Sequence, residues 1–147
     1  MTSTKRKIYV ASSWRNQHQP SVVISLRLAE HQVYDFRNPS PGEHGFAWAQ
    51  IDLDWSNWSL TQYREALKSP VAQKGFKLDK GGLNWADTCV LVLPCGRSAH
   101  LEAGYMIGDG KQCFFYLPEE GFEPELMYLL GTKITLSMQE LLKELET

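Results

Sequence analysis

The sequence predicts an α/β fold in which about five parallel strands form a doubly wound sheet between two layers of helices. Three short runs, Lys7–Ser12, Thr88–Leu93 and Gln112–Leu117, are almost continuously apolar, which is typical of strands buried on both faces. Segments with the apolar spacing of helices lie between these runs. Strands that alternate with helices favour a parallel sheet covered on both sides.

Two weaker runs, His31–Phe36 and Lys133–Leu136, complete the five expected strands. In a sheet of order 2-1-3-4-5, the first and third strands along the chain are neighbours. A chain of 147 residues suits one domain with one core. We therefore expect a single domain that spans residues 1–147.

The helices are predicted from their amino ends. Pro20 starts one segment whose apolar residues share a face, and Ser98 stands where the amino cap of another helix is expected. Ser59–Gln62 and Ser137–Glu140 have the capping-box pattern, in which a serine and a Glu or Gln three residues later satisfy free backbone N–H groups. A further helical segment is expected over Pro124–Leu130.

Two regions do not fit this alternation. Gly81-Gly82 interrupts the helical segment that approaches the third strand. Residues 38–58 form a long stretch without a clear period, and loops of that length in compact domains are usually functional or disordered. Its tryptophans argue against disorder. We expect a lid or wall with Trp55 or Trp58 against a ligand, the alternative being that both rings pack on the sheet.

Composition excludes several classes of function. A formal charge of -2 gives no basic excess to attract a nucleic acid polymer. No apolar run approaches the roughly 18 residues of a membrane span, and the polar start, Met1–Lys7, does not suggest a secretory signal. The 3 cysteines form no CxxC pair, which favours a reducing cytoplasm. His100 has no partner at metal-ligand spacing, so neither a metal nor another cofactor is expected.

Chemically interesting side chains follow two of the predicted strands. Ala11–Asn16 comes directly after the first strand, and a stretch with Ser98 and Glu102 follows the third. Ligands of open parallel sheets bind beyond the carboxyl ends of the strands, so both stretches should face one crevice. The start of a helix favours a carboxylate or a bound anion. The alternative is that Ser98 only caps the helix and that Glu102 is a solvated acidic residue.

Other candidates have similar alternatives. Arg15 and Arg97 could hold a phosphate or could be ordinary surface residues. Tyr9, within the first strand, is ordinarily part of the core or of the sheet surface. Asp79 and Asp87 lie on either side of the entry to the third strand, where aspartate often serves as a turn or cap residue.

Taken together, these residues resemble the nucleoside 2-deoxyribosyltransferase-like family, including its deoxynucleoside-monophosphate N-glycosidases. The matching pieces, in the expected order and spacing, are Ile8–Arg15, Asp79, Trp85–Asp87, Gly96–Ser98 and Gly104–Gly108. The resemblance implies a flavodoxin-like, Rossmann-like three-layer sandwich. It also implies an enzyme that cleaves or transfers at the N-glycosidic bond of a nucleoside or a nucleoside 5′-monophosphate through a glutamate nucleophile.

The resemblance implies roles for individual residues. Tyr9 would contact the glutamate, Asp79 would assist the leaving base, and Ser13, Arg15 and Ser98 would hold a 5′-phosphate. The other residues implicated in substrate binding are Gly96, Arg97, Asp87, Trp55 and Trp58. Such enzymes often dimerise and complete each site with the neighbouring subunit, so a homodimer or higher homo-oligomer is expected.

One departure from the family pattern concerns the nucleophile. The family commonly has glutamate where this chain has Met106, and the glutamate near the helix start is Glu102. Four residues rotate a helix by about 400°, so Glu102 keeps nearly the same face one turn earlier. The spacing of Ser98 and Glu102 is also similar to that of TIR-domain NAD glycohydrolases. Cleavage of NAD, or nucleotide binding without catalysis, are the alternative functions.

Overall fold

The computed structural model describes residues 5–147; residues 1–4, part of the polar amino end, lie outside it. The chain forms two compact units. The first comprises the chain up to Asp35 together with Leu83–Thr147, and the second is Phe36–Gly82. The first unit contains the whole sheet, and the second contains the long segment 38–58, which has no clear sequence period.

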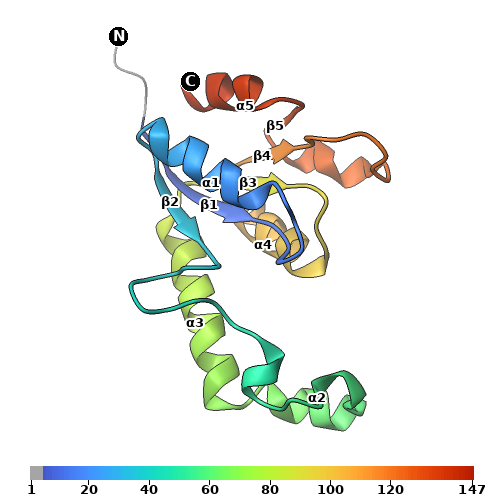
Figure 1. The fold of residues 1–147 in the computed structure, drawn as a ribbon. Coiled ribbons are helices and arrows are strands. Elements are labelled where there is room, and N and C mark those ends of the chain that lie inside the picture. Colours follow the sequence, from blue (N-terminus) through green and yellow to red (C-terminus); the bar gives the residue numbers. More distant parts are fainter. Residues whose placement is uncertain (1–4) are drawn as a thin grey trace. The chain divides into compact units, whose positions relative to one another are not determined.

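The sheet of the first unit has five parallel strands (Figure 1). They are β1 (Lys7–Ala11), β2 (Gln32–Asp35), β3 (Thr88–Val92), β4 (Gln112–Tyr116) and β5 (Lys133–Thr135). Their order is β2-β1-β3-β4-β5, and all four pairings are parallel. The predicted fold class and strand order are therefore confirmed.

Helices cover both faces of this sheet (Figure 1). On one face, side chains of α1 (Gln19–Leu28) and α5 (Met138–Leu145) pack on the sheet in one buried apolar cluster. On the other face, α4 (Arg97–Gly108) and the 3-10 helix η3 (Leu126–Leu130) contribute to a second cluster. The chain thus has the three layers that the sequence predicts.

Strand β1 shows how the sequence divides its side chains between the two layers. Ile8 and Val10 point into the cluster with α1 and α5, whereas Tyr9 and Ala11 point into the cluster with α4. All four are fully buried. This alternation is the period of two that a strand imposes, and burial of a large apolar side chain stabilises the fold by about 1.5–3 kcal/mol.

Two further helical predictions were partly right. Half of the predicted capping box of α5 forms: the Ser137 hydroxyl accepts a hydrogen bond from the backbone N–H of Glu140 at 3.1 Å, whereas the Glu140 carboxylate accepts one from the Leu136 N–H at 3.2 Å. Residues 124–130 do not form an α-helix. Only the short η3 forms there, and the Glu125 carboxylate accepts a hydrogen bond from the Met127 N–H (2.8 Å) at its start.

The second unit contains short helical elements. They are η1 (Trp48–Gln50), η2 (Trp55–Asn57), α2 (Leu60–Ala66) and most of α3 (Pro70–Trp85). The predicted capping box begins α2, with the Ser59 hydroxyl accepting a hydrogen bond from the Gln62 N–H at 3.1 Å.

The predicted interruption at Gly81-Gly82 is wrong, because α3 runs through both glycines to Trp85. Glycine lowers helix stability by only about 1 kcal/mol, and its backbone still makes helical hydrogen bonds. Among residues 5–147, no helix combines the length and the apolar character needed to cross a bilayer.

Candidate functional site

A tyrosine and a glutamate meet between the sheet and α4. Tyr9 is fully buried in the central strand β1, and its hydroxyl donates a hydrogen bond to the Glu102 carboxylate. Glu102 itself is half-buried. Ala99 and Ala103 are the nearly fully buried residues of α4 on either side of Glu102 along the chain. These small side chains allow α4 to lie close to the sheet, so that the carboxylate reaches the phenol.

Met106, one turn later in α4, occupies a different environment. Its side chain is fully buried in the apolar cluster beneath the helix. A carboxylate there would lose its hydration among apolar groups, which strongly disfavours the charged form. In this chain, position 102 presents a carboxylate to Tyr9, and position 106 belongs to the core.

A second possible nucleophile lies near this carboxylate. Burial, reinforced by the negative charge of Glu102, raises the pKa of Cys95 to about 12. The reactive form of cysteine is the thiolate, and a thiol with that pKa stays protonated at neutral pH. Cys95 is therefore a poor nucleophile at neutral pH.

His100 and Tyr128 fix the first turn of α4. The His100 ring donates from Nδ1 to the Gly96 carbonyl (2.7 Å), so its Nε2 accepts the hydrogen bond from the Tyr128 hydroxyl (2.8 Å). Burial raises the pKa of Tyr128 to about 12, which keeps this donor protonated. The Tyr128 ring also stacks on Phe115, with 4.5 Å between ring centres. From the sequence, His100 was considered only as a metal ligand, and its hydrogen bonds at the start of α4 were missed.

The amino end of α4 differs from the expected one. Gly96, with extended backbone, is the amino cap, and Ser98 is the second residue of the helix. The prediction that Ser98 caps the helix is therefore wrong. Ser98 and Arg97 are both exposed at the first turn, where free N–H groups and the helix dipole favour an anion.

Two buried polar residues tie the loop after β1 to the chain that follows β3. The Ser12 hydroxyl donates to the Val92 carbonyl at 2.9 Å, and the Asn16 side-chain amide donates to the Pro94 carbonyl at 2.9 Å. The loop that carries Ser13 and exposed Arg15 is thus held at the same sheet edge as the start of α4. Neither Ser12 nor Asn16 was singled out from the sequence.

The structure does not bring Asp87 to this edge. Asp87 precedes β3, and its carboxylate accepts hydrogen bonds from the Thr88 hydroxyl (2.8 Å) and from the backbone N–H of Lys7 (3.3 Å). Both partners are the first residues of their strands. These hydrogen bonds place Asp87 at the amino ends of the two strands, and its contact with a substrate stays a prediction.

Asp79 lies in the second unit, where it lines a pocket of about 230 Å³. Phe46 and Gln50 contribute to the same pocket. Gly75 of α3 permits close contact there, because a Cβ at this position would lie 3.0 Å from the Phe46 side chain. The pocket thus combines an aromatic wall with amide and carboxylate groups.

The tryptophans of the second unit have different environments. Trp58 packs edge-on against Trp48 at 5.7 Å, and its indole N–H donates to the Asp52 carboxylate at 2.8 Å. Hydrogen bonds from the Asp54 N–H and from this indole lower the pKa of Asp52. Trp55 is 44% exposed. Trp58 thus belongs to an aromatic cluster of its own unit, and contact of Trp55 or Trp58 with a ligand stays a prediction.

Within residues 5–147, no three His, Cys, Asp or Glu side chains lie close enough together to hold a metal ion.

Comparison with known proteins gives likeness in structure but not in sequence. No protein-family model and no curated protein matches the chain. Among solved structures, a 2-deoxyribosyltransferase from the psychrotolerant bacterium Bacillus psychrosaccharolyticus is 18% identical with a TM-score of 0.61, over 95% of this chain and 90% of that one. A conserved protein from Enterococcus faecalis V583 is 14% identical with a TM-score of 0.60, over 97% and 98%. The resemblance seen in the sequence therefore extends to the fold, and this chain is folded like a 2-deoxyribosyltransferase.

Proposed function

We propose that the protein cleaves the N-glycosidic bond of a nucleoside or nucleoside 5′-monophosphate, or transfers its sugar, with Glu102 as the nucleophile. The observation that carries the proposal is the hydrogen bond from Tyr9 to the half-buried Glu102 carboxylate. A phenol that donates to a carboxylate favours the ionised form and fixes one of its oxygens. The fold shared with a 2-deoxyribosyltransferase supports the same reaction class.

The proposed chemistry proceeds in two displacements. A Glu102 oxygen bonds to C1′ of the sugar as the bond from C1′ to the base nitrogen breaks, and the electron pair of that bond leaves with the base. A second nucleophile then attacks C1′ and releases the carboxylate, as in retaining glycosidases. Water as the second nucleophile gives hydrolysis, and another base gives transfer.

The departing base gains a negative charge unless it is protonated. The resemblance to the family assigns this protonation to Asp79, a carboxylate of the second unit.

A phosphate on the sugar would be held by the start of α4 and by the loop after β1. Arg97 and Ser98 stand at the first turn of the helix, and Arg15 is exposed on a loop anchored to the same sheet edge through Asn16. Guanidinium groups and free helix N–H groups both favour a phosphate dianion.

Met106 had suggested a noncatalytic nucleotide-binding module, because glutamate is the family residue there. The burial of Met106 removes that reason, since position 106 belongs to the core and Glu102 takes the contact with Tyr9. Cleavage of NAD would use the same kind of carboxylate. An assay that offers both NAD and nucleosides distinguishes this alternative from the proposed function.

The decisive experiment incubates the protein with a panel of nucleosides, nucleoside 5′-monophosphates and NAD, and measures the release of free base or nicotinamide. We expect Glu102→Gln to fold normally and to lose at least about a hundredfold of turnover, as loss of a covalent nucleophile requires. Glu120→Gln, on an exposed loop of the same unit, is the matched control and should leave turnover unchanged. Turnover of Glu102→Gln within a few-fold of wild type would refute the assignment.

A second prediction concerns the phosphate. Arg15→Ala should weaken binding of a monophosphate much more than binding of the matching nucleoside, because a charged hydrogen bond contributes about 1.5–3 kcal/mol. Isothermal titration calorimetry with both ligands, at low and at high salt, measures the difference. Equal losses for the two ligands would show that Arg15 does not recognise phosphate.

A further inference from the structure

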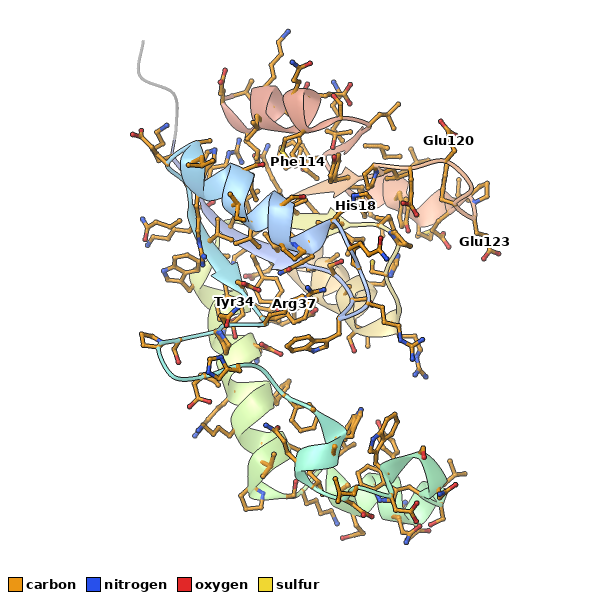
Figure 2. All side chains as sticks on the ribbon, viewed as in Figure 1. His18, Tyr34, Arg37, Phe114, Glu120 and Glu123 are labelled. Carbon is orange, nitrogen blue, oxygen red and sulfur yellow. The ribbon has the colours of Figure 1, made fainter. Side chains whose placement is uncertain are left out.

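Tyr34 lies directly beside Tyr9 in the sheet. It belongs to β2, and the register of the two parallel strands pairs the two tyrosines. Their rings are stacked, with 5.1 Å between ring centres and 10° between ring planes. Tyr34, which is labelled in Figure 2, is half-buried. It packs against the apolar cluster that contains Tyr9.

This stack restricts the orientation of the Tyr9 ring. The position of a tyrosine hydroxyl depends on rotation about two side-chain bonds, and an adjacent parallel ring allows little rotation about either. The Tyr9 hydroxyl is the atom that donates to Glu102. The plane of the Tyr34 ring therefore helps to determine where that donor points.

We propose that Tyr34 is a positioning residue for the Glu102 nucleophile, acting through the ring of Tyr9. The proposal rests on the proposed function and adds to it a residue that neither the motif pattern nor the chemistry of the reaction names. The Tyr34 ring orients the Tyr9 phenol, and the phenol orients the Glu102 carboxylate through its hydrogen bond. Three elements of the first unit thus cooperate to direct one oxygen atom.

A positioning role predicts a particular kinetic pattern. Loss of the stack misaligns the carboxylate and leaves the sugar, base and phosphate contacts in place, so kcat should fall while KM stays within about twofold. If the whole stabilisation by a stacked aromatic pair is lost from the transition state, kcat should fall by roughly 2- to 13-fold. Tyr34→Leu removes the aromatic ring, whereas Tyr34→Phe keeps it and should retain nearly wild-type turnover.

The test combines kinetics with a measurement that needs no turnover. Turnover of the best substrate in the panel is measured for wild type, Tyr34→Leu, Tyr34→Phe, Tyr9→Phe and the double variant Tyr9→Phe/Tyr34→Leu. Val33→Ala is the control for β2 stability, because Val33 packs in the cluster on the opposite face of the sheet. In parallel, carbon-13 NMR follows the ionisation of the Glu102 carboxyl group in each variant.

If Tyr34 acts through Tyr9, Tyr34→Leu should slow wild type but add almost nothing to Tyr9→Phe, because the hydroxyl it directs is already absent. The ionisation midpoint of Glu102 should move to higher pH in Tyr34→Leu, in the same direction as in Tyr9→Phe. Independent, multiplicative losses of kcat would overturn the proposal, and so would an unchanged ionisation of Glu102 in folded Tyr34→Leu.

The same experiment separates this proposal from the proposed function. If Glu102→Gln keeps its turnover, the nucleophile assignment fails, and the NMR comparison still decides whether Tyr34 orients the pair. If Glu102→Gln is inactive while Tyr34→Leu matches wild type in kcat and in Glu102 ionisation, only the role of Tyr34 fails.

Discussion

His31 is a buried histidine at the amino edge of the sheet, away from the site residues of α4. Its Nδ1 accepts a hydrogen bond from the backbone N–H of Arg6 at 3.0 Å. Burial lowers the pKa of His31, and the nearby positive charges of Lys5 and Arg6 lower it further. The folded protein therefore binds this proton less readily than the unfolded chain does.

The pH dependence of stability follows from that difference. An unfolded histidine has a pKa of about 6.5, so the contribution of neutral His31 is intact above that pH. Stability should fall as the pH drops below about 6.5 towards the lowered pKa of the folded state, because only the unfolded chain gains the proton. Urea unfolding between pH 7.5 and 5 measures the effect.

His31→Asn provides the matched control for this prediction, because its side-chain oxygen can accept the same hydrogen bond and does not titrate. Its free energy of unfolding should change less between pH 7.5 and 5 than that of wild type. Identical pH profiles for the two proteins would contradict the role given to His31.

The site shows which residue roles a sequence can indicate. Glu102 was identified because it is the carboxylate near a helix start after a buried strand, and the resemblance to a family supplied its contact with Tyr9. Asn16 and His100 were missed as structural partners, because they bond the carbonyls of Pro94 and Gly96, and backbone carbonyls leave no residue-specific signal. The hydrogen bonds of Asp87 at the amino ends of β1 and β3 could not be read from the spacing of the sequence.

Among the structural elements, α3 offers a direct test of glycine in a helix. A Cβ at Gly81 would meet no atom within 4 Å, so Gly81→Ala should raise the free energy of unfolding by about 0.5–1 kcal/mol. Gly131, after η3, has the opposite environment, because a Cβ there would lie 2.0 Å from the Phe115 ring. Gly131→Ala should destabilise the protein by about 1–3 kcal/mol.

Chemical denaturation of both variants checks the signs. Gly131→Ala should also disturb the stack of Phe115 on Tyr128, which near-ultraviolet circular dichroism detects. Equal changes in the free energy of unfolding for the two variants would show that contact with the Phe115 ring does not determine the effect of Gly131→Ala.

The elements differed in how well the sequence predicts them. The three strongly apolar strands were clear because burial on both faces leaves an uninterrupted run of apolar residues. The continuity of α3 was missed because local glycine propensity is weaker than the hydrogen bonds of a 16-residue helix. The structure of residues 38–58 follows from contacts among aromatic rings, which have no sequence period.

At the scale of the whole molecule, the chain has two compact units, and each contains candidate site residues. The first holds the proposed nucleophile and phosphate contacts, and the second holds the pocket with Asp79. Whether the chain acts as one domain and forms a homodimer stays a prediction. Apolar side chains exposed on η3 are compatible with such an assembly: Leu126, Met127, Leu129 and Leu130.

The position of α5 after all five strands has a consequence for biosynthesis. Leu141 and Leu145 are fully buried against Val10, Val90 and Phe114 in the cluster on one face of the sheet. While the chain is being made, these sheet residues exist long before the helix that covers them. The growing chain therefore exposes an apolar surface until α5 has been synthesised, and that surface is where chaperone binding or aggregation should begin.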